Sequence, residues 1–373
     1  KLGYPVHVFE AQPVGGGMLG LAVPEFRLPR DVIQEEIAYI ESCGVKIHYN
    51  SPIDARHTVH DLMEEGCSAV FIAAGAQSAK SMGIAGEDEG VEGILHGLRF
   101  LTAIRSGEDI RLKGKVVVLG GGNVALDVAR TALRVGAEDV QIFYRRTVEE
   151  MPAWKKDIDE AVEEGVAINP LWAPRRILHR DGRVQGMEFM RSRTVLDPDG
   201  STRLSVDEEA AQTVEADAVI VSVGQAPDIS FLSEDTQLER ALWGSLVVDE
   251  NSLSTNIPGI FAGGDFTTGP STVIQAIASG RRAALAMDRY LLGKKGRLSI
   301  LDEKSAWHEA SGLALDEETQ EPNPRADIDM EQAEQRRRDF REVEKGLNEE
   351  QARYEAMRCL RCDLERERRG EEA

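Results

Sequence analysis

The chain has 373 residues, 65 of them acidic and 44 basic, which gives a formal net charge of -21 at neutral pH. Such a charge repels nucleic acids and anionic membranes, so we expect no nucleic acid partner. No apolar run approaches the roughly 20 residues that a membrane-spanning helix needs, so we expect no membrane insertion. The four cysteines do not form a disulfide framework, which favours a reducing, cytoplasmic location.

The first predicted element is a short apolar strand over residues 6–9, which ends at the acidic residue Glu10. In a dinucleotide-binding unit an acid in this place binds a ribose, and a glycine turn lies about 20 residues before it. The pattern indicates that Glu10 binds the adenosine ribose of FAD, with Gly16, Gly17 and Met18 close by. The alternative is a solvated strand end. We expect the glycine turn to be encoded before residue 1.

Helices and strands alternate over the next segment, which predicts a mostly parallel sheet. An amphipathic helix ends near Gly44, a strand follows over 45–49, and a second helix covers about 58–65. A further apolar strand covers 69–75, and we expect its last residues, Ala74 and Gly75, to lie beside the flavin nucleotide. The residues that share one face of the first helix are Val32, Ile33, Ile37 and Ile40.

The run "VVVLGGGNVALDVA" has the glycine spacing of a nucleotide-binding turn, G-x-G-x-x-A, formed by Gly120, Gly122 and Ala125. The first glycine permits the tight turn, the second lets the backbone approach a pyrophosphate, and the small third residue lets helix and strand pack closely. Because Asn123 begins the helix, the unpaired N–H groups of its first turn face the phosphates. This segment therefore predicts a nicotinamide nucleotide site.

The strand after this turn ends in Arg145 and Arg146 rather than in an acid. An acid would bind the free 2′-hydroxyl of NAD, whereas guanidinium groups suit a 2′-phosphate. The two arginines therefore favour NADPH over NADH. The alternative is that they lie on a solvated strand end. Polar and apolar residues then alternate over 175–213 around "RDG" and "PDG", which predicts antiparallel hairpins.

The run "IFAGGD" predicts a flavin site. A strand over 260–262 ends at two glycines, which leave room for a ligand, and Asp265 follows them. A helix begins near Thr272 and directs its positive end to the same place. The carboxylate of Asp265 suits ribityl hydroxyls, and the helix end favours negative charge on a reduced flavin. We therefore expect Gly264, Asp265 and Thr272 to bind FAD.

These motifs together resemble those of the two-dinucleotide-binding-domain flavoproteins, above all the small subunit of glutamate synthase. The matching runs are "VFEAQPVGGGMLGLAVPEFRLP", "GGGNVALDVART", "IFYRRTVEEMPAW" and "IFAGGDFTTGPSTVIQAIASGRRAA". The resemblance implies an α/β fold with two Rossmann-like domains. The NAD(P) domain, residues 113–222, is inserted into an FAD domain formed by 1–112 and 223–292, and a charged tail covers 293–373.

Two of the four cysteines, Cys359 and Cys362, form a C-x-x-C motif in the tail. The motif follows a predicted helix that has Asn348 as its N-cap and Gln351 at its third position. The two thiolates can ligate a metal or a 4Fe-4S cluster, form a redox pair, or be incidental. Residues 293–350 are strongly charged, which favours a solvated or partner-wrapping arm. No cysteine pair lies beside either predicted nucleotide site, so we expect no internal redox disulfide, and Cys43 and Cys67 should be ordinary semi-buried residues.

The resemblance implies an NAD(P)H-dependent FAD oxidoreductase subunit. Electrons would pass from NAD(P)H through FAD to iron-sulfur centres or to a partner redox subunit, which for glutamate synthase is the large subunit. Hydride transfer between two rings needs no acid–base residue, so no catalytic residue is assigned. Two alternatives stay open: a self-contained reductase of quinones or small electron carriers, and a non-catalytic assembly subunit.

Overall fold

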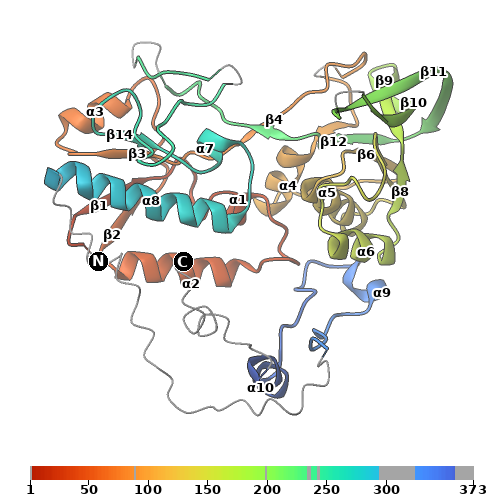
Figure 1. The fold of residues 1–373 in the computed structure, drawn as a ribbon. Coiled ribbons are helices and arrows are strands. Elements are labelled where there is room, and N and C mark those ends of the chain that lie inside the picture. Colours follow the sequence, from red (N-terminus) through yellow and green to blue (C-terminus); the bar gives the residue numbers. More distant parts are fainter. Residues whose placement is uncertain are drawn as a thin grey trace.

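The structure is a computed structural model that describes residues 2–87, 90–197, 200–232, 237–241, 244–293 and 324–357. Two units lie side by side, and the last of these segments lies beneath them (Figure 1). We call residues 2–87 and 228–293 the outer unit and residues 90–222 the inserted unit. The antiparallel pair of β4 (Ser78–Ala79) and β13 (Gln225–Ala226) forms part of the connection between them.

The inserted unit contains a five-stranded parallel sheet in the order β5-β12-β6-β7-β8. Four of the five residues of its central strand β6 are buried, because helices cover one face of the sheet and the antiparallel strands β9 and β10 cover the other. The elements are β5 (Ile94–His96), α4 (Gly97–Arg105), β6 (Lys115–Leu119), α5 (Asn123–Arg134), β7 (Asp139–Tyr144), α6 (Lys155–Glu163), β8 (Ala167–Pro170) and β12 (Ala218–Val221).

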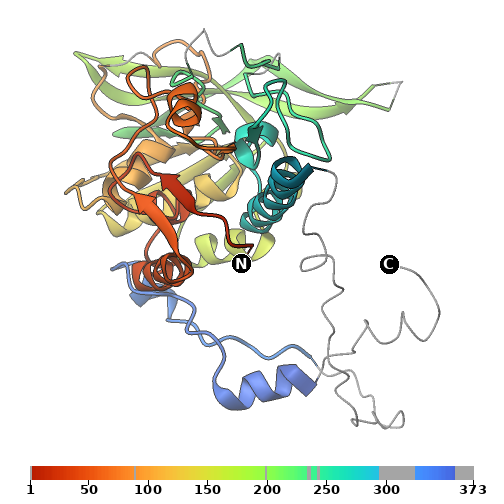
Figure 2. The same cartoon turned by 90° about the vertical axis from the view of Figure 1, so that its left-hand side faces the viewer.

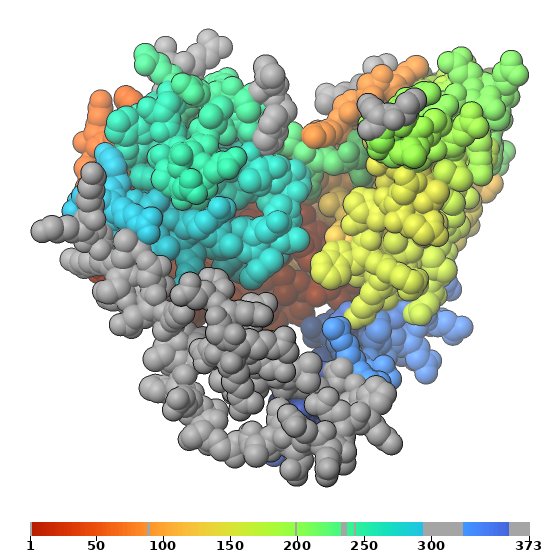
Figure 3. Space-filling model, in the orientation of Figure 1, coloured from red at the N-terminus to blue at the C-terminus, as the bar shows by residue number. Residues whose placement is uncertain are grey.

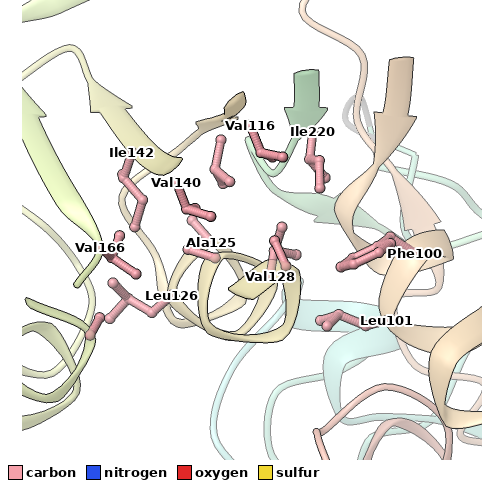
Figure 4. Packing of buried hydrophobic residues seen from close by; sticks show 14 of the residues in the cluster. Phe100, Leu101, Val116, Ala125, Leu126, Val128, Val140, Ile142, Val166 and Ile220 are labelled. Atoms are coloured by element: carbon pink, nitrogen blue, oxygen red, sulfur yellow. The ribbon is translucent and has the colours of Figure 1, made fainter. Parts of the chain in front are cut away.

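Helix α5 lies at the centre of the core of this unit. Its residues Ala125, Leu126 and Val128 are fully buried and face the sheet residues Val116 and Ile142 (Figure 4). A continuous apolar face of this kind is what the helical spacing of the sequence predicts. The core therefore holds the start of α5 firmly against the end of β6.

The inserted unit begins earlier than the predicted boundary at residue 113. Strand β5 pairs in parallel with β12, and Leu98, Phe100 and Leu101 of α4 are buried in the same core as α5. The three residues of β5 are too few to carry a periodic pattern, so the sequence did not reveal them. Residues 94–105 thus belong to the inserted sheet and its core.

A three-stranded antiparallel sheet extends from the inserted unit, and the hairpins predicted over 175–213 are confirmed. The ring of Phe189 stacks on that of Phe143 with centroids 4.0 Å apart, which fixes this sheet to the parallel one. The strands are β9 (Trp172–Arg180), β10 (Arg183–Leu196) and β11 (Thr202–Glu215).

The outer unit is more open. Its described strands form two parallel pairs, β1 with β2 and β3 with β14, so β1 and β3 each have a described partner on one side only. Three of the four residues of β1 are exposed. The strands are β1 (Val6–Phe9), β2 (Val45–His48), β3 (Val70–Ile72) and β14 (Ile260–Ala262), and the helices are α1 (Met18–Leu21), α2 (Arg30–Ser42), α3 (Val59–Glu64), α7 (Asp265–Thr268) and α8 (Val273–Leu292).

Helix α2 buries less than the sequence pattern predicts. Ile33 is buried and Ile37 is partly buried, but Val32 and Ile40 are 46% and 42% exposed. These two residues extend the apolar face beyond the part that the described chain covers. Cys43, at the end of the helix, is exposed rather than semi-buried, while Cys67 has intermediate exposure.

The described part of the charged tail runs along the underside of the molecule (Figure 2). Its helices are α9 (Ala333–Arg336) and α10 (Glu349–Met357), and the predicted cap of α10 is confirmed by reciprocal bonds between Asn348 and Gln351. Within the described ranges, no helix is both long and apolar enough to cross a bilayer.

Candidate dinucleotide sites

The glycine turn of the inserted unit is closely packed. A side chain at Gly120 would approach the carbonyl oxygen of Ser222 to under 3.0 Å, and one at Gly121 would come within 2.5 Å of the Tyr144 ring. Gly122 is the N-cap of α5, and Asn123 is its first residue. Only glycine fits the first two positions, and the helix N-terminus that they support is a ready anion site.

Arg145 and Arg146 follow β7 directly, as predicted. Their carbonyl groups are held by the β9–β10 hairpin, because Ser192 Oγ donates to Arg145 O at 2.7 Å and Leu171 N donates to Arg146 O at 3.0 Å. Neither guanidinium forms an ion pair with any residue that the structure describes, whereas a third arginine, Arg191, lies over the Trp172 ring. Arg145 is exposed and Arg146 half-buried, so both are available to an anion.

The loop from Thr147 to Trp154 folds back onto the glycine turn. Tyr144 Oη donates to Glu150 O at 3.0 Å, and Ala153 N donates to Gly121 O at 3.2 Å. Asn123 Oδ1 accepts the Trp154 N–H at 3.2 Å. The loop therefore links the strand end that carries the arginines to the first residue of α5.

In the outer unit, Asp265 stands at the end of β14 with an unsatisfied oxygen. Its Oδ1 is buried and accepts no hydrogen bond from the described residues. The preceding turn is tight, since Gly264 has a φ of 64° and a side chain at Gly263 would come within 2.5 Å of Ser279 Oγ. A buried acceptor without a partner is costly, and a ligand hydroxyl would satisfy it. This buried acceptor fits the hydroxyl groups of the ribityl chain of a flavin.

Helix α8 begins as predicted, with Thr272 as its N-cap and Gln275 completing a capping box. Ser279 lies one helical turn after Gln275. Its Oγ accepts the Gly264 N–H at 2.8 Å, which holds α8 against the glycine turn. The first turn of α8 lies at the end of the helix nearer the inserted unit (Figure 1). Its positive end therefore faces the neighbouring unit.

Glu10 lies at the end of β1, where its backbone continues the pairing with β2 through a bond from Glu10 N to His48 O of 2.9 Å. One carboxylate oxygen accepts the Gln12 N–H at 2.8 Å, which fixes the side chain while leaving acceptor capacity. The side chain can therefore accept further hydrogen bonds from a ribose.

The glycines after Glu10 serve the turn into α1. Gly16 has a φ of 98° and lies against Ile33, and Gly17 has a φ of 55° with open space around its Cα. Met18 is partly buried against the core of the inserted unit. The structure thus places Met18 at a contact between the units.

Ala74 and Gly75 follow β3. Ala74 is partly buried in the outer core, and Gly75 has a φ of 72° with nothing within 4 Å of an added side chain. The open space here lies next to the strand that pairs with β14, so these residues and Asp265 share one end of the same strand pair. The site residues predicted from separate motifs thus fall into two groups, one in each unit.

A broad notch separates the two units on the face shown in Figure 3. The contact between the units includes Phe26 and Arg27 of the outer unit. Arg27 binds Asp127 at 2.8 Å and Asp157 at 2.7 Å. Burial alone would lower the pKa of Arg27, but these carboxylates reverse the direction and raise it. The Phe26 ring is 1% exposed, with the Arg134 guanidinium 3.9 Å from its centroid.

The tail strengthens this contact, so the expectation of a solvated arm is wrong for part of it. Val343 is 2% exposed and donates its N–H to Phe26 O at 3.0 Å, and Arg336 is 4% exposed. Arg336 pairs with Glu164, which also accepts bonds of 2.6 Å from both Arg130 and Arg134. Burial opposes the ionisation of Glu164, yet the hydrogen bonds from Arg134 and Arg130 hold its pKa below the usual range.

The predicted metal ligands Cys359 and Cys362 lie outside the described residues. Within the part of the chain that the structure describes, no group of three or more His, Cys, Asp and Glu side chains could hold a metal ion. Cys43 and Cys67 are free cysteines.

Sequence reasoning missed Ser279, Ser222 and Trp154. Ser279 lies two turns into α8, a place where a serine is unremarkable in a sequence. Ser222 contributes only its backbone oxygen, which any residue supplies. Trp154 ends the run "IFYRRTVEEMPAW", but the sequence does not show that this residue is 65% exposed.

Comparison with known proteins defines the class. The fold is that of the two-dinucleotide-binding-domain flavoproteins, as predicted: FprA from Mycobacterium tuberculosis superposes with a TM-score of 0.67 at 19% identity, over 78% of this chain and 79% of that one. The model of the pyridine nucleotide-disulphide oxidoreductase family matches residues 10–280. The chain belongs to this family.

Three relatives refine the placement. The chain is 40% identical to the beta subunit of NADP(+)-dependent formate dehydrogenase from Moorella thermoacetica, over 96% of this chain and 51% of the relative. It is 34% identical to the beta subunit of NADPH-Fe(3+) oxidoreductase from Geobacter sulfurreducens, over 96% and 58%. It is 33% identical to the small chain of glutamate synthase [NADPH] from Azospirillum brasilense, over 78% and 63%. The predicted likeness to the glutamate synthase small chain is confirmed, and the chain spans about half to two thirds of these relatives.

Proposed function

We propose that the chain is the part of an NADPH-oxidising flavoprotein subunit that carries both nucleotide sites and passes electrons from NADPH through FAD to a partner redox subunit. The proposal rests on two features together. Asp265 has a buried Oδ1 that accepts no bond from the described residues, and the exposed Arg145 and half-buried Arg146 lie beside a glycine turn in the neighbouring unit. The carboxylate of Asp265 suits the hydroxyls of a flavin nucleotide, and the arginines with the glycine turn suit the phosphates of NADPH.

In this proposal FAD is held by the outer unit. Asp265 and Gly264 would contact the ribityl chain, and Thr272 would present the first turn of α8 to the flavin ring. Glu10 would accept bonds from the adenosine ribose. The remaining positions that would line the nucleotide are Gly16, Gly17, Met18, Ala74 and Gly75.

NADPH would be bound by the inserted unit. Gly120, Gly122 and Ala125 shape the turn, and Asn123 begins the helix whose N–H groups face the pyrophosphate. Arg145 and Arg146 would bind the 2′-phosphate, because bidentate guanidinium–phosphate contacts are strong and geometrically specific.

The main task of the protein in this reaction would be to position the two cofactors. FAD, when bound, accepts a hydride and can release electrons singly. The residues of this chain would hold two rings in contact, keep water from the notch and favour negative charge near the first turn of α8. No described side chain needs to exchange a proton with the nicotinamide.

The partner would be a redox or iron-sulfur subunit in a reducing, cytoplasmic setting. The names of the relatives support a partner subunit, since they are beta subunits or a small chain of larger enzymes. Cys359 and Cys362 would contribute two ligands to a 4Fe-4S cluster shared with other cysteines. The acceptor of the electrons would then be reached through that cluster.

The proposal is tested with the protein expressed from its complete gene and loaded with FAD. Under anaerobic conditions, stoichiometric NADPH should bleach the flavin absorbance. A bound flavin that stays oxidised with both NADPH and NADH would overturn the proposed function.

A further inference from the structure

Trp154 is an exposed aromatic residue at the end of a loop in which Met151 and Ala153 are buried. The indole-bearing residue is 65% exposed, whereas its neighbours Met151 and Ala153 are 6% and 8% exposed. Trp154 makes no stacking or cation–π contact with any described side chain. Most of the surface of this residue is therefore accessible to a ligand.

The backbone around Trp154 is nevertheless fixed to the nucleotide turn. Its N–H donates to Asn123 Oδ1 at 3.2 Å, and the preceding Ala153 N donates to Gly121 O at 3.2 Å. The ring of Pro152 lies 3.9 Å from where a side chain at Gly122 would begin. Residues 152–154 thus all contact the glycine turn or Asn123, and Trp154 lies beside the start of α5. The φ of Trp154 is -68°, so its backbone is unstrained.

The same loop begins at the two arginines. Arg145 and Arg146 stand at its first end beside β7, and Trp154 stands at its last end beside Asn123. In a nucleotide bound between these ends, the pyrophosphate lies at the helix and the 2′-phosphate at the arginines. The part of the molecule between the two is the adenosine, whose base has a flat π-face.

We propose that Trp154 is a binding residue for the nicotinamide nucleotide and that its indole stacks on the adenine ring. The inference rests on the proposed NADPH site and adds a residue that the glycine turn and the arginines do not supply. Stacking of a base on an aromatic ring is tolerant of geometry and is strengthened where water is excluded, which suits an indole at the rim of the turn.

Trp172 provides a matched control within the inserted unit. It is a second tryptophan, lies on β9, packs against the core beneath that sheet and has the Arg191 guanidinium 5.0 Å from its ring. Its ring already has partners, so it should not respond to a nucleotide.

The test measures binding of 2′,5′-ADP and of NADP+ by calorimetry in the full protein, with wild type, Trp154→Ala, Trp154→Phe and Trp172→Phe. We expect Trp154→Ala to weaken 2′,5′-ADP about tenfold, while Trp154→Phe keeps most of the affinity and Trp172→Phe matches wild type. Thermal unfolding of Trp154→Ala should match wild type because the indole is exposed. Tryptophan emission should be quenched by 2′,5′-ADP in wild type and Trp172→Phe but not in Trp154→Phe.

Unchanged affinity in Trp154→Ala would overturn the stacking proposal. A loss seen with NADP+ but not with 2′,5′-ADP would overturn the assignment to adenine. If wild type binds neither compound, the proposed nicotinamide site itself fails, and that result is distinct from both.

Discussion

The inserted and outer units carry similar sequence signals but differ in how completely their strands are enclosed. Four of five residues in β6 are buried, and β6 has described neighbours on both sides. Three of four residues in β1 are exposed, and its described partner lies on one side. A strand followed by glycines and a charged residue thus predicts which end of the strand would bind a nucleotide. How deeply that strand is buried depends on the neighbouring strands, which lie outside the motif.

The same contrast appears in the glycines. At Gly120 a side chain would approach the Ser222 carbonyl to under 3.0 Å, whereas at Gly17 nothing lies within 4 Å and only the φ of 55° favours glycine. One glycine is required by packing and the other by backbone conformation alone.

The largest expected effect is on the enclosed unit. Glu164 is 0% exposed and binds three arginines, so Glu164→Ala would leave buried positive charge unpaired. We expect a loss of about 3–5 kcal/mol in the free energy of unfolding, measured with urea. Asp159→Ala is the control, since its pair with Lys155 is exposed and should contribute at most about 0.5 kcal/mol. Similar small losses in both variants would contradict the role of this cluster.

The second prediction compares two glycine turns. Gly120→Ala should weaken NADP+ binding at least about a hundredfold, because the Ser222 backbone must shift and the turn must deform. Gly17→Ala should leave NADP+ binding unchanged and cost about 1 kcal/mol of stability from its positive φ. Calorimetric titration with NADP+ checks both variants. Equal effects would show that the enclosure of the inserted turn does not matter.

The third prediction concerns the unsatisfied carboxylate of the outer unit. Asp265→Ala should weaken FAD about tenfold by removing an acceptor for ribityl hydroxyls, and it should leave NADP+ affinity unchanged. The released flavin is measured by fluorescence after dialysis of the protein expressed from its complete gene. FAD retention equal to that of wild type would remove Asp265 from the proposed site.

The smallest expected effect is a pH dependence. The folded-state pKa of Glu164 lies below its usual value because the hydrogen bonds from Arg134 and Arg130 outweigh burial. Its stabilising contribution is therefore present above its unfolded pKa, about 4.3, and is lost as pH falls through the folded value. The difference in melting temperature between wild type and Glu164→Gln should narrow as the pH falls below about 4. A difference that grows on acidification would contradict this sign.

Local signals in the sequence were sufficient for much of the fold. The cap at Asn348 was readable because a cap and its partner lie three residues apart, and the structure confirms its reciprocal bonds with Gln351. The predicted helix starts near Thr58 and Thr272 are also confirmed, and the structure adds a capping box at each. The glycine turns and their following helices were readable for the same reason. Their roles in binding FAD and NADPH stay predictions.

Contacts between distant segments could not be predicted in this way. Val343 bonds to Phe26, and the Phe26 ring lies against Arg134, which binds Glu164, so three separate parts of the chain are joined there. The composition of the tail gave no indication that Arg336 and Val343 would be buried. The short strand β5 was missed because three residues carry no period. Long-range packing decided both features, and single-sequence patterns contain little information about it.

We propose that NADPH, held by its 2′-phosphate, reduces FAD on this protein. The most direct measurement is the rate of anaerobic flavin bleaching by NADPH and by NADH in the FAD-loaded protein, for wild type and Arg145→Gln. In wild type, the flavin should be bleached at least about tenfold faster by NADPH than by NADH. Arg145→Gln should remove most of this preference, because a guanidinium–phosphate contact is lost. Equal rates for the two nucleotides in wild type, or a preference that survives in Arg145→Gln, would contradict it.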